Sequence, residues 1–421
     1  MNFKKYRIAD LIDDISMGPF GSNIKVDCFV DSGVPVLNGS NLDGFTLKEE
    51  SFRYVTEEKA DSLKRANAKK GDIVITHRGT LGQIVYIPQN AKYERYVISQ
   101  SQFRIRCNEH VLPEYLVFYF HTRVGQHKIL SNASQVGVPA LARPSTTFQQ
   151  IEVELPDIEV QKKIVSILQS FNDKIELNNK INANLQQQAQ AIFKSWFVDF
   201  EPFQDGEFVE SELGTIPVEF TITRTGGLPL IVTDYVANGS FASLKANVHL
   251  YQERNYAYFI RNIDLKSGEF KVFVDEHSYN FLSKSRLQGG EIIISNVGDV
   301  GSVFLCPVLD GPMTLGNNII MLKPERQELQ YYLYIWFKWS LGQSLMQGIK
   351  SGSAQPKFNK TDFKSLPIVL PPEKILQEFH ELVSPIFKLV EKNQVENRKI
   401  AMLRDVLLPK LMNGAIDIRK D

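Results

Sequence analysis

Short clusters of polar side chains recur in both halves of this 421-residue chain. They combine amides, hydroxyls, an imidazole and guanidinium groups, all of which make directional hydrogen bonds. In the first half the cluster residues are Asn38, Ser40, Asn41, His77, Arg78, Thr80, Gln100, Gln102, Ser134 and Gln135. In the second half they are Arg261, Asn262, Asn296, Asn317, Asn318, Ser353 and Gln355. Together they fit recognition of a polar partner, although each one singly also fits a solvated loop.

The familiar sequence motifs of catalysis are missing. The chain has no GxxxxGK[ST], HExxH, CxxC or GxSxG segment. Leu370-Pro371-Pro372-Glu373 lacks the acid and the aromatic of the adenine-methylase tetrapeptide, and no Pro-Asp pair precedes Glu57-Glu58-Lys59 to complete a nuclease site. We therefore expect the chain to be non-catalytic, with any chemistry carried out by another chain.

The segments that carry these clusters occur twice. A shift of 215 residues places Leu155-Pro156 on Leu370-Pro371, and a shift of 219 places residues 71–75 on residues 290–294. The glycines of residues 79–82 recur at residues 298–301. A period of this length excludes a solenoid, whose repeats are about 20–50 residues long. The order is domain, helix, domain, helix.

Each domain is predicted to consist of short β-strands with glycine-rich turns, followed by one helix. The expected strands are residues 73–75, 84–87 and 103–105 in the first copy, and 292–294, 303–305 and 319–322 in the second. Residues 113–120 and 329–337 are expected to be helical. The glycines of residues 79–82 and 298–301 most simply allow positive φ in a tight hairpin.

A heptad pattern follows each domain. The first seam is Ile164, Leu168, Phe171, Ile175, Asn178, Asn182, Leu185, Ala189, Ile192 and Trp196, and the second is Phe379, Val383, Ile386, Val390, Asn393, Asn397, Ile400, Arg404, Leu407 and Leu411. We expect the two helices to pair antiparallel, with Asn178 and Asn182 near Asn397 and Asn393 to fix the register. Pro385 and Pro409 are expected to kink or break the second helix.

The overall composition is that of an ordinary globular protein. Hydrophobic residues make up 43% of the chain, charged residues make up 23%, and the formal net charge is zero, which says nothing about local charge. The three cysteines lie far apart and fit a reducing compartment. No apolar run approaches 18 residues, so a cytoplasmic protein is expected.

From Ser195 to Thr223 the chain is acidic, without Lys or Arg, and resembles a linker held in place by aromatic residues.

Several longer motifs resemble the specificity (S) subunit of type I restriction–modification systems. They are Gly18-Pro19-Phe20-Gly21-Ser22, the segment 71–75 with its following glycines, residues 193–202, Leu213-Gly214-Thr215-Ile216-Pro217 and residues 403–411. The resemblance covers essentially the whole chain. Ala242 departs from it, because Gly21 is the matching residue of the first copy, so the second opening loop is expected to differ in shape.

The resemblance implies an α+β fold of two tandem, similar globular α/β target-recognition domains. Two long antiparallel helices would separate them as a coiled-coil-like spacer with pseudo-twofold symmetry. The expected boundaries are residues 1–150 for the first domain, 151–198 for the first spacer helix, 199–217 for the acidic linker, 218–366 for the second domain and 367–421 for the second helix and tail.

The resemblance also implies that each domain reads one half of a bipartite double-stranded DNA target. Two methyltransferase (M) subunits using S-adenosylmethionine and two restriction (R) subunits using ATP and Mg would be the partners, and this chain would bind no cofactor. The polar clusters would read base edges, and Lys25, Lys245, Lys350 and Lys357 would contact phosphates. The alternatives are a methyltransferase or nuclease with an unrecognised active site, and a DNA-binding module of a non-restriction regulator.

Overall fold

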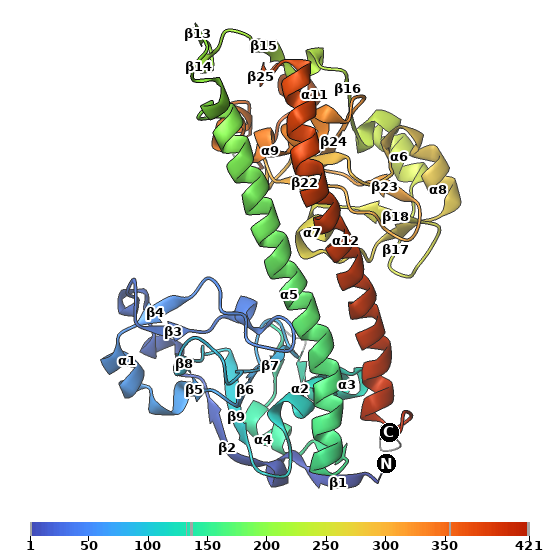
Figure 1. Cartoon of the computed structure of the whole chain (residues 1–421). Coiled ribbons are helices and arrows are strands. Elements are labelled where there is room, and N and C mark those ends of the chain that lie inside the picture. Colours follow the sequence, from blue (N-terminus) through green and yellow to red (C-terminus); the bar gives the residue numbers. More distant parts are fainter. Residues whose placement is uncertain (1, 132, 135–137, 353–354, 419–421) are drawn as a thin grey trace. The chain divides into compact units, whose positions relative to one another are not determined.

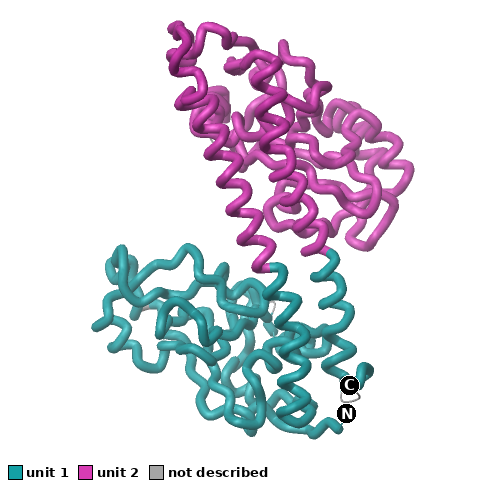
Figure 2. The backbone as a smooth tube through the Cα atoms, viewed as in Figure 1, with its two compact units in different colours: residues 1–175, 399–421 teal, residues 176–398 magenta. Residues whose placement is uncertain are grey.

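The computed structural model describes residues 2–131, 133–134, 138–352 and 355–418. The chain forms two compact units, one of Met1–Ile175 with Lys399–Asp421 and one of Glu176–Arg398 (Figure 2). The division crosses both long helices, so each unit contains a segment of each helix.

The first unit is built on two four-stranded sheets and two strand pairs (Figure 1). One sheet has the order β2 (Ile12–Met17), β9 (Gln102–Cys107), β6 (Asp72–Thr76), β7 (Ile84–Tyr86), and the other has the order β4 (Arg53–Val55), β3 (Val34–Val36), β8 (Arg95–Val97), β5 (Asn67–Lys69). One pair is β1 (Lys4–Arg7) with β12 (Glu152–Leu155). The other pair is β10 (Ala133–Ser134) with β11 (Ala140–Leu141). The short α-helices are α1 (Glu57–Ser62), α2 (Pro113–His121), α3 (Arg123–Leu130) and α4 (Pro144–Gln149).

The second unit repeats this plan with the same strand order, except that its second sheet has one additional strand, β17, at its edge. Its first sheet is β16 (Leu230–Asp234), β24 (Ile319–Pro324), β21 (Ile292–Ser295), β22 (Val303–Leu305), and its second is β17 (Leu250–Tyr251), β19 (Phe273–Val274), β18 (Ala257–Ile260), β23 (Met313–Leu315), β20 (Arg286–Leu287). β15 (Thr221–Arg224) pairs with β25 (Pro367–Leu370). The other elements are β13 (Phe208–Ser211), β14 (Gly214–Pro217), α6 (Phe241–Asn247), α7 (Asn262–Ser267), α8 (Glu276–Phe281), α9 (Glu328–Lys338), α10 (Ser340–Gly348) and α11 (Lys360–Lys364).

The strands and helices expected within the domains are confirmed, but the expectation of one helix in each domain is wrong, because each domain has several. β6 and β21 are runs of isoleucine and valine that are buried on both faces, and such continuous apolar runs are typical of strands covered on both sides. Tyr115 to Phe120 of α2 are likewise all buried. α2 therefore forms part of the core of the first unit.

The glycine turns take the backbone conformation expected of them. φ is +89° at Gly79, +83° at Gly82, +75° at Gly298 and +97° at Gly301. A glutamine on α3 or α10 holds each turn: Gln126 Nε2 donates to the carbonyl oxygens of Gly82 and Phe120 at 2.9 and 2.8 Å. Gln343 Nε2 donates to those of Gly301 and Phe337 at 2.8 and 2.6 Å. The repeat is therefore copied at the level of single hydrogen bonds.

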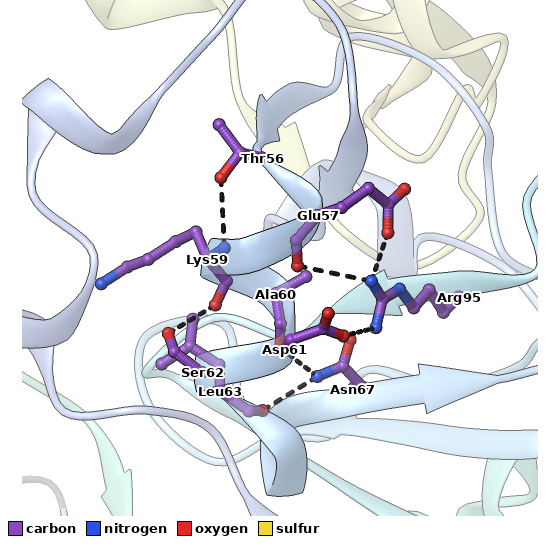
Figure 3. A network of polar contacts seen from close by, with 9 residues as sticks. All are labelled: Thr56, Glu57, Lys59, Ala60, Asp61, Ser62, Leu63, Asn67 and Arg95. Atoms are coloured by element: carbon purple, nitrogen blue, oxygen red, sulfur yellow. Dashed lines mark hydrogen bonds and ion pairs between the residues drawn. The ribbon is translucent and has the colours of Figure 1, made fainter.

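A polar network fixes α1 on the second sheet of the first unit (Figure 3). Thr56 Oγ1 accepts from the amide of Lys59 at 3.1 Å and caps the helix. Arg95, on β8, binds Asp61 at 2.6 Å and also the carboxylate of Glu57. Asn67 Nδ2 donates to the carbonyl oxygens at the end of the helix. Arg95 is thus engaged within the fold.

Two forty-residue helices, α5 (Ile158–Phe197) and α12 (Glu373–Met412), follow the domains. Their antiparallel pairing is confirmed within each unit. In the second unit Asn178 Nδ2 donates to Asn397 Oδ1, and Asn393 Nδ2 donates to Asn182 Oδ1, both at 2.8 Å. In the first unit Arg404 Nη1 donates to Asn172 Oδ1 at 2.9 Å. Among the described residues, neither these nor any other helix is long and apolar enough to cross a membrane.

The expectation that prolines break the second helix is wrong, because α12 runs unbroken through Pro385 and Pro409. An interior proline costs about 3 kcal/mol through a lost hydrogen bond and a clash. Both prolines lie on the exposed side of the helix, while their neighbours Val383 and Leu408 are buried in the cores. Burial of such side chains, at about 1.5–3 kcal/mol each, offsets the loss.

Each core is completed by a helix that belongs to the other repeat. The core of the first unit includes Leu408, Leu411 and Met412 from α12 beside Ile164 and Leu168 from α5. The core of the second unit includes Ala189, Phe193 and Phe197 from α5, and the rings of Phe197 and Phe379 lie 4.9 Å apart.

The acidic segment is ordered by aromatic contacts, as its phenylalanines suggested. Phe200 and Phe203 both pack on Phe220, with ring centroids 5.7 and 5.1 Å apart. β13 and β14 then form a hairpin within it.

The amide pair between Asn182 and Asn393 offers a test of the seam. Both side chains are buried, so Asn182→Ala leaves the amide of Asn393 without its partner and should lower the free energy of unfolding by about 1–3 kcal/mol. The double replacement Asn182→Leu with Asn393→Leu should recover most of this loss, because both polar groups are then gone. Urea unfolding of the wild type, Asn182→Leu, Asn393→Leu and the double variant measures the cycle. A double variant as unstable as the sum of its single variants would contradict the pairing.

Candidate functional site

In the first unit, three polar clusters meet at one end of the sheet β2-β9-β6-β7. His77 follows β6, and its amide donates to Ser101 O at 2.9 Å in the turn before β9. His77 Nε2 lies 3.2 Å from Gln100 O. Gln102 Nε2 donates to Asn38 O at 3.3 Å, at the start of the 3₁₀ turn Gly39–Leu42. Residues 38–41, 77–80 and 99–102 therefore form one surface, which we name the first loop cluster.

The hairpin of β10 and β11 joins this cluster. Gly79 N donates to Pro139 O and Leu141 N donates to His77 O, both at 2.9 Å. Ser134 lies opposite Ala140 in the hairpin, and Ala140 forms a bridge with Arg78. Gln135, another candidate, lies outside the described residues.

The second unit holds its loops with matching bonds. Asn296 N donates to Asn318 O at 3.1 Å, and Gly298 N donates to Pro356 O at 2.8 Å. Asn262 Nδ2 donates to Asp299 Oδ2 at 3.3 Å. Residues 261–262, 296–299, 317–318 and 355–358 therefore form a second loop cluster. Ser353 lies outside the described residues.

Most candidate side chains reach solvent. Exposed candidates are Lys25, Ser40, Arg78, Thr80, Gln100, Ser134, Lys245, Asn317, Asn318, Lys350, Gln355 and Lys357. Half-buried candidates are Asn38, His77, Arg261, Asn262 and Asn296. Lys357 belongs to the second cluster, and its backbone pairs with that of Ser351.

Asn41 and Gln102 are the exceptions, because each is 1% exposed. Asn41 Nδ2 donates to the carbonyl oxygens of Lys48 and Glu50 at 2.9 and 2.8 Å, and its Oδ1 accepts from the amide of Asn38. The side chain of Gln102 donates to Asn38 O and accepts from the amide of Ser99. As buried amides must be paired, we correct their role: they shape the loops and do not contact a partner.

The candidate Arg261 is held by a carboxylate that the sequence did not indicate. Its Nε and Nη2 donate to the two oxygens of Asp264 at 2.9 and 2.7 Å, and this hydrogen bonding raises the pKa of Arg261. The guanidinium edge that would read a guanine is thus occupied. The i,i+3 spacing of Arg261 and Asp264 was the available signal.

Other residues in the clusters were missed. Gln83 Nε2 donates to Gly39 O at 3.1 Å and links two loops of the first cluster. Asp299 accepts from Lys266 at 2.6 Å, from Ser302 and from Asn262, and these bonds lower its pKa to about 2. No sequence pattern marks Gln83, whereas Asp299 lies inside the repeated turn of residues 298–301.

Burial lowers the pKa of His77 from its ordinary value of 6.5, although the hydrogen bond to Gln100 opposes this shift. His77 is therefore a neutral imidazole at pH 7. Since Gln100 O can only accept, Nε2 carries the proton and Nδ1 is left as an acceptor.

Comparison with known proteins agrees with this duplicated architecture. The family model described as "Type I restriction modification DNA specificity domain" matches residues 3–187 and again residues 198–403. The MjaIX type I restriction enzyme specificity subunit of Methanocaldococcus jannaschii is 28% identical over 87% of this chain and 83% of its own length. The HindI specificity subunit of Haemophilus influenzae is 26% identical over 83% of this chain and 87% of its own length.

A solved structure has the same fold. The crystal structure of a type I restriction–modification S subunit from M. genitalium superimposes with a TM-score of 0.55 at 15% sequence identity, over 98% of this chain and 96% of the other. Two matches of the family model cover most of the residues, one on each copy of the repeat. The chain therefore belongs to the family of type I restriction–modification DNA specificity proteins and carries the specificity domain twice.

Proposed function

We propose that this chain is the DNA-recognition subunit of a type I restriction–modification complex. Each domain reads one half of a bipartite target and directs adenine methylation and cleavage by partner subunits. The observation that carries the proposal is the pair of loop clusters. In each unit, corresponding loops lie at the corresponding end of the corresponding sheet and are held by matching backbone hydrogen bonds. A duplicated framework with different side chains suits two unrelated half-targets.

The chain itself is the non-catalytic member of that complex. Its curated relatives are named as specificity subunits, which supports this role. The catalytic partners would be two M subunits using S-adenosylmethionine and two R subunits using ATP and Mg, so no cofactor is assigned to this chain.

The exposed residues of the clusters are the proposed base readers. Arg78 can pair with a guanine edge, and Gln100 or Asn317 with an adenine edge, each for about 1–3 kcal/mol of discrimination. The four candidate lysines, Lys25, Lys245, Lys350 and Lys357, are assigned to phosphates, whose contacts give affinity without selectivity. The antiparallel helices serve as the spacer between the domains, with the asparagine layer fixing their register.

Exchanging part of the first domain tests the proposal. Residues 12–150 are replaced by those of another family member, so that β1 still pairs with β12 and the long helices α5 and α12 keep their own sequence. Expressed with the cognate M subunits in a methylation-free host, the hybrid should methylate a target with one new half and one unchanged half. Sequencing of methylated adenines reads the outcome, and a hybrid that changes both halves would refute separate reading by the two domains.

Arg78→Ala tests a single reader. Arg78 is exposed beside the hairpin of β10 and β11, and its loss should relax selectivity at one base pair by about 1–3 kcal/mol in one half-target alone. Methylation rates on a panel of single-base variants measure this. Arg7→Ala removes another exposed arginine, which precedes the opposite end of β2, and it should leave the panel unchanged. Equal loss in both halves by Arg78→Ala would argue against the assignment.

The neutral His77 gives a pH dependence. Because its folded pKa lies below that of the unfolded chain, its contribution to stability is present above about pH 6.5 and is lost as the pH falls through the folded value. The imidazole signal of selectively labelled protein, assigned with His77→Gln, should titrate below 6.5. His77→Gln should also flatten the fall in melting temperature between pH 7 and 5. A His77 titration above 6.5 would disprove a neutral reader.

A further inference from the structure

Two phenylalanines are presented to solvent at matching places in the two repeats. Phe20 is 83% exposed and Phe241 is 81% exposed, whereas the next most exposed of the 27 phenylalanines, all within the described chain, is Phe208 at 37%. The matching of Gly18, Phe20 and Ser22 with Gly239, Phe241 and Ser243 places the two rings at the same point of the repeat. Leaving an aromatic ring in water is unfavourable, so its recurrence at one position calls for a partner.

In the first unit the backbone around Phe20 is pressed against the first loop cluster. Gly18 N donates to Gln102 O at 2.8 Å. A Cβ at Gly18 would lie 1.9 Å from Ser99 O, and a Cβ at Gly21 would lie 2.2 Å from Gln100 Oε1. The two glycines therefore fix this segment against residues 99–102, and the ring of Phe20 extends into solvent from a braced loop.

In the second unit the same position is the first residue of a helix. Ser240 caps α6, and Phe241 and Lys245, four residues apart on it, lie on one helical face and are both exposed. α6 follows β16, whose last residue, Asp234, pairs with Ile320, close after the candidate Asn318. The local structure differs from that of the first copy, as the Ala242 departure suggested, yet the ring is again exposed.

We propose that Phe20 and Phe241 insert between base pairs of the bound DNA, one in each half-target. This inference rests on the proposed function. A methyltransferase must take its target base out of the stack, which is costly in an intact duplex. Apolar side chains such as phenylalanine insert between base steps, unstack them and kink the duplex. Phe20, braced beside Gln100, would open the step next to the bases that the first cluster reads, and Lys245 beside Phe241 would neutralise a neighbouring phosphate.

The test uses the complex assembled with its M subunits, on duplexes carrying the mapped target. 2-Aminopurine replaces single bases of one half-target in turn, because its fluorescence rises when the base is unstacked. Phe20→Ala should abolish the rise in the first half-target and slow methylation there roughly tenfold. The second half-target and the sequence recognised should stay unchanged, and Phe20→Trp should retain both signals. Phe241→Ala is the reciprocal control and should affect the second half-target alone.

The outcomes separate the two proposals. A wild-type complex without sequence-specific methylation overturns the proposed function and this inference with it. Specific methylation with wild-type fluorescence and rates in Phe20→Ala overturns the inference alone. Loss of M subunits from the Phe20→Ala complex during gel filtration would show that the ring contacts protein, and this too overturns the inference.

Discussion

The fold depends on the exchange of helices between the two repeats. Neither domain closes its core with its own sequence: the first unit needs Leu408 and Leu411 from α12, and the second needs Phe193 and Phe197 from α5. An antiparallel return of the second helix satisfies both needs at once. The same seam buries amides that must find each other, so the pairing of Asn182 with Asn393 penalises any shifted register.

On this frame the repeats keep their backbone bonds and vary their side chains. The bond from Gly79 to Pro139 recurs from Gly298 to Pro356, and the glutamine that holds each glycine turn recurs as well. At the same places His77 is replaced by Asn296 and Thr80 by Asp299. A constant scaffold with variable loop tips lets each copy take its own specificity without loss of stability.

Elements that follow a period were predictable from the sequence, and features set by individual contacts were not. Burial imposes a regular spacing on apolar residues, so the sequence alone predicted the strands β6 and β21 and the two long helices. Polar loop residues look alike in sequence whether they face solvent or the chain, so the burial of Asn41 and Gln102 went unseen. The prediction that the prolines would break α12 was wrong, because the free-energy cost of a proline inside a helix is smaller than the cost of exposing its buried neighbours. The i,i+3 spacing of Arg261 and Asp264 is visible in the sequence, but the capping hydrogen bond from the amide of Arg261 to Asp264 Oδ2 is set by the local backbone.

The borrowed helices have a consequence for how such a gene could have arisen. A polypeptide with a single repeat would have a helix whose apolar stripe is exposed and a core that lacks the helix supplied by the other repeat. In a symmetric homodimer of two identical copies, the helix of each copy would cover the open core of the other copy and bury its own apolar stripe there. Such an ancestor would have bound palindromic sites, and fusion of duplicated genes would then have freed each half to diverge toward asymmetric ones.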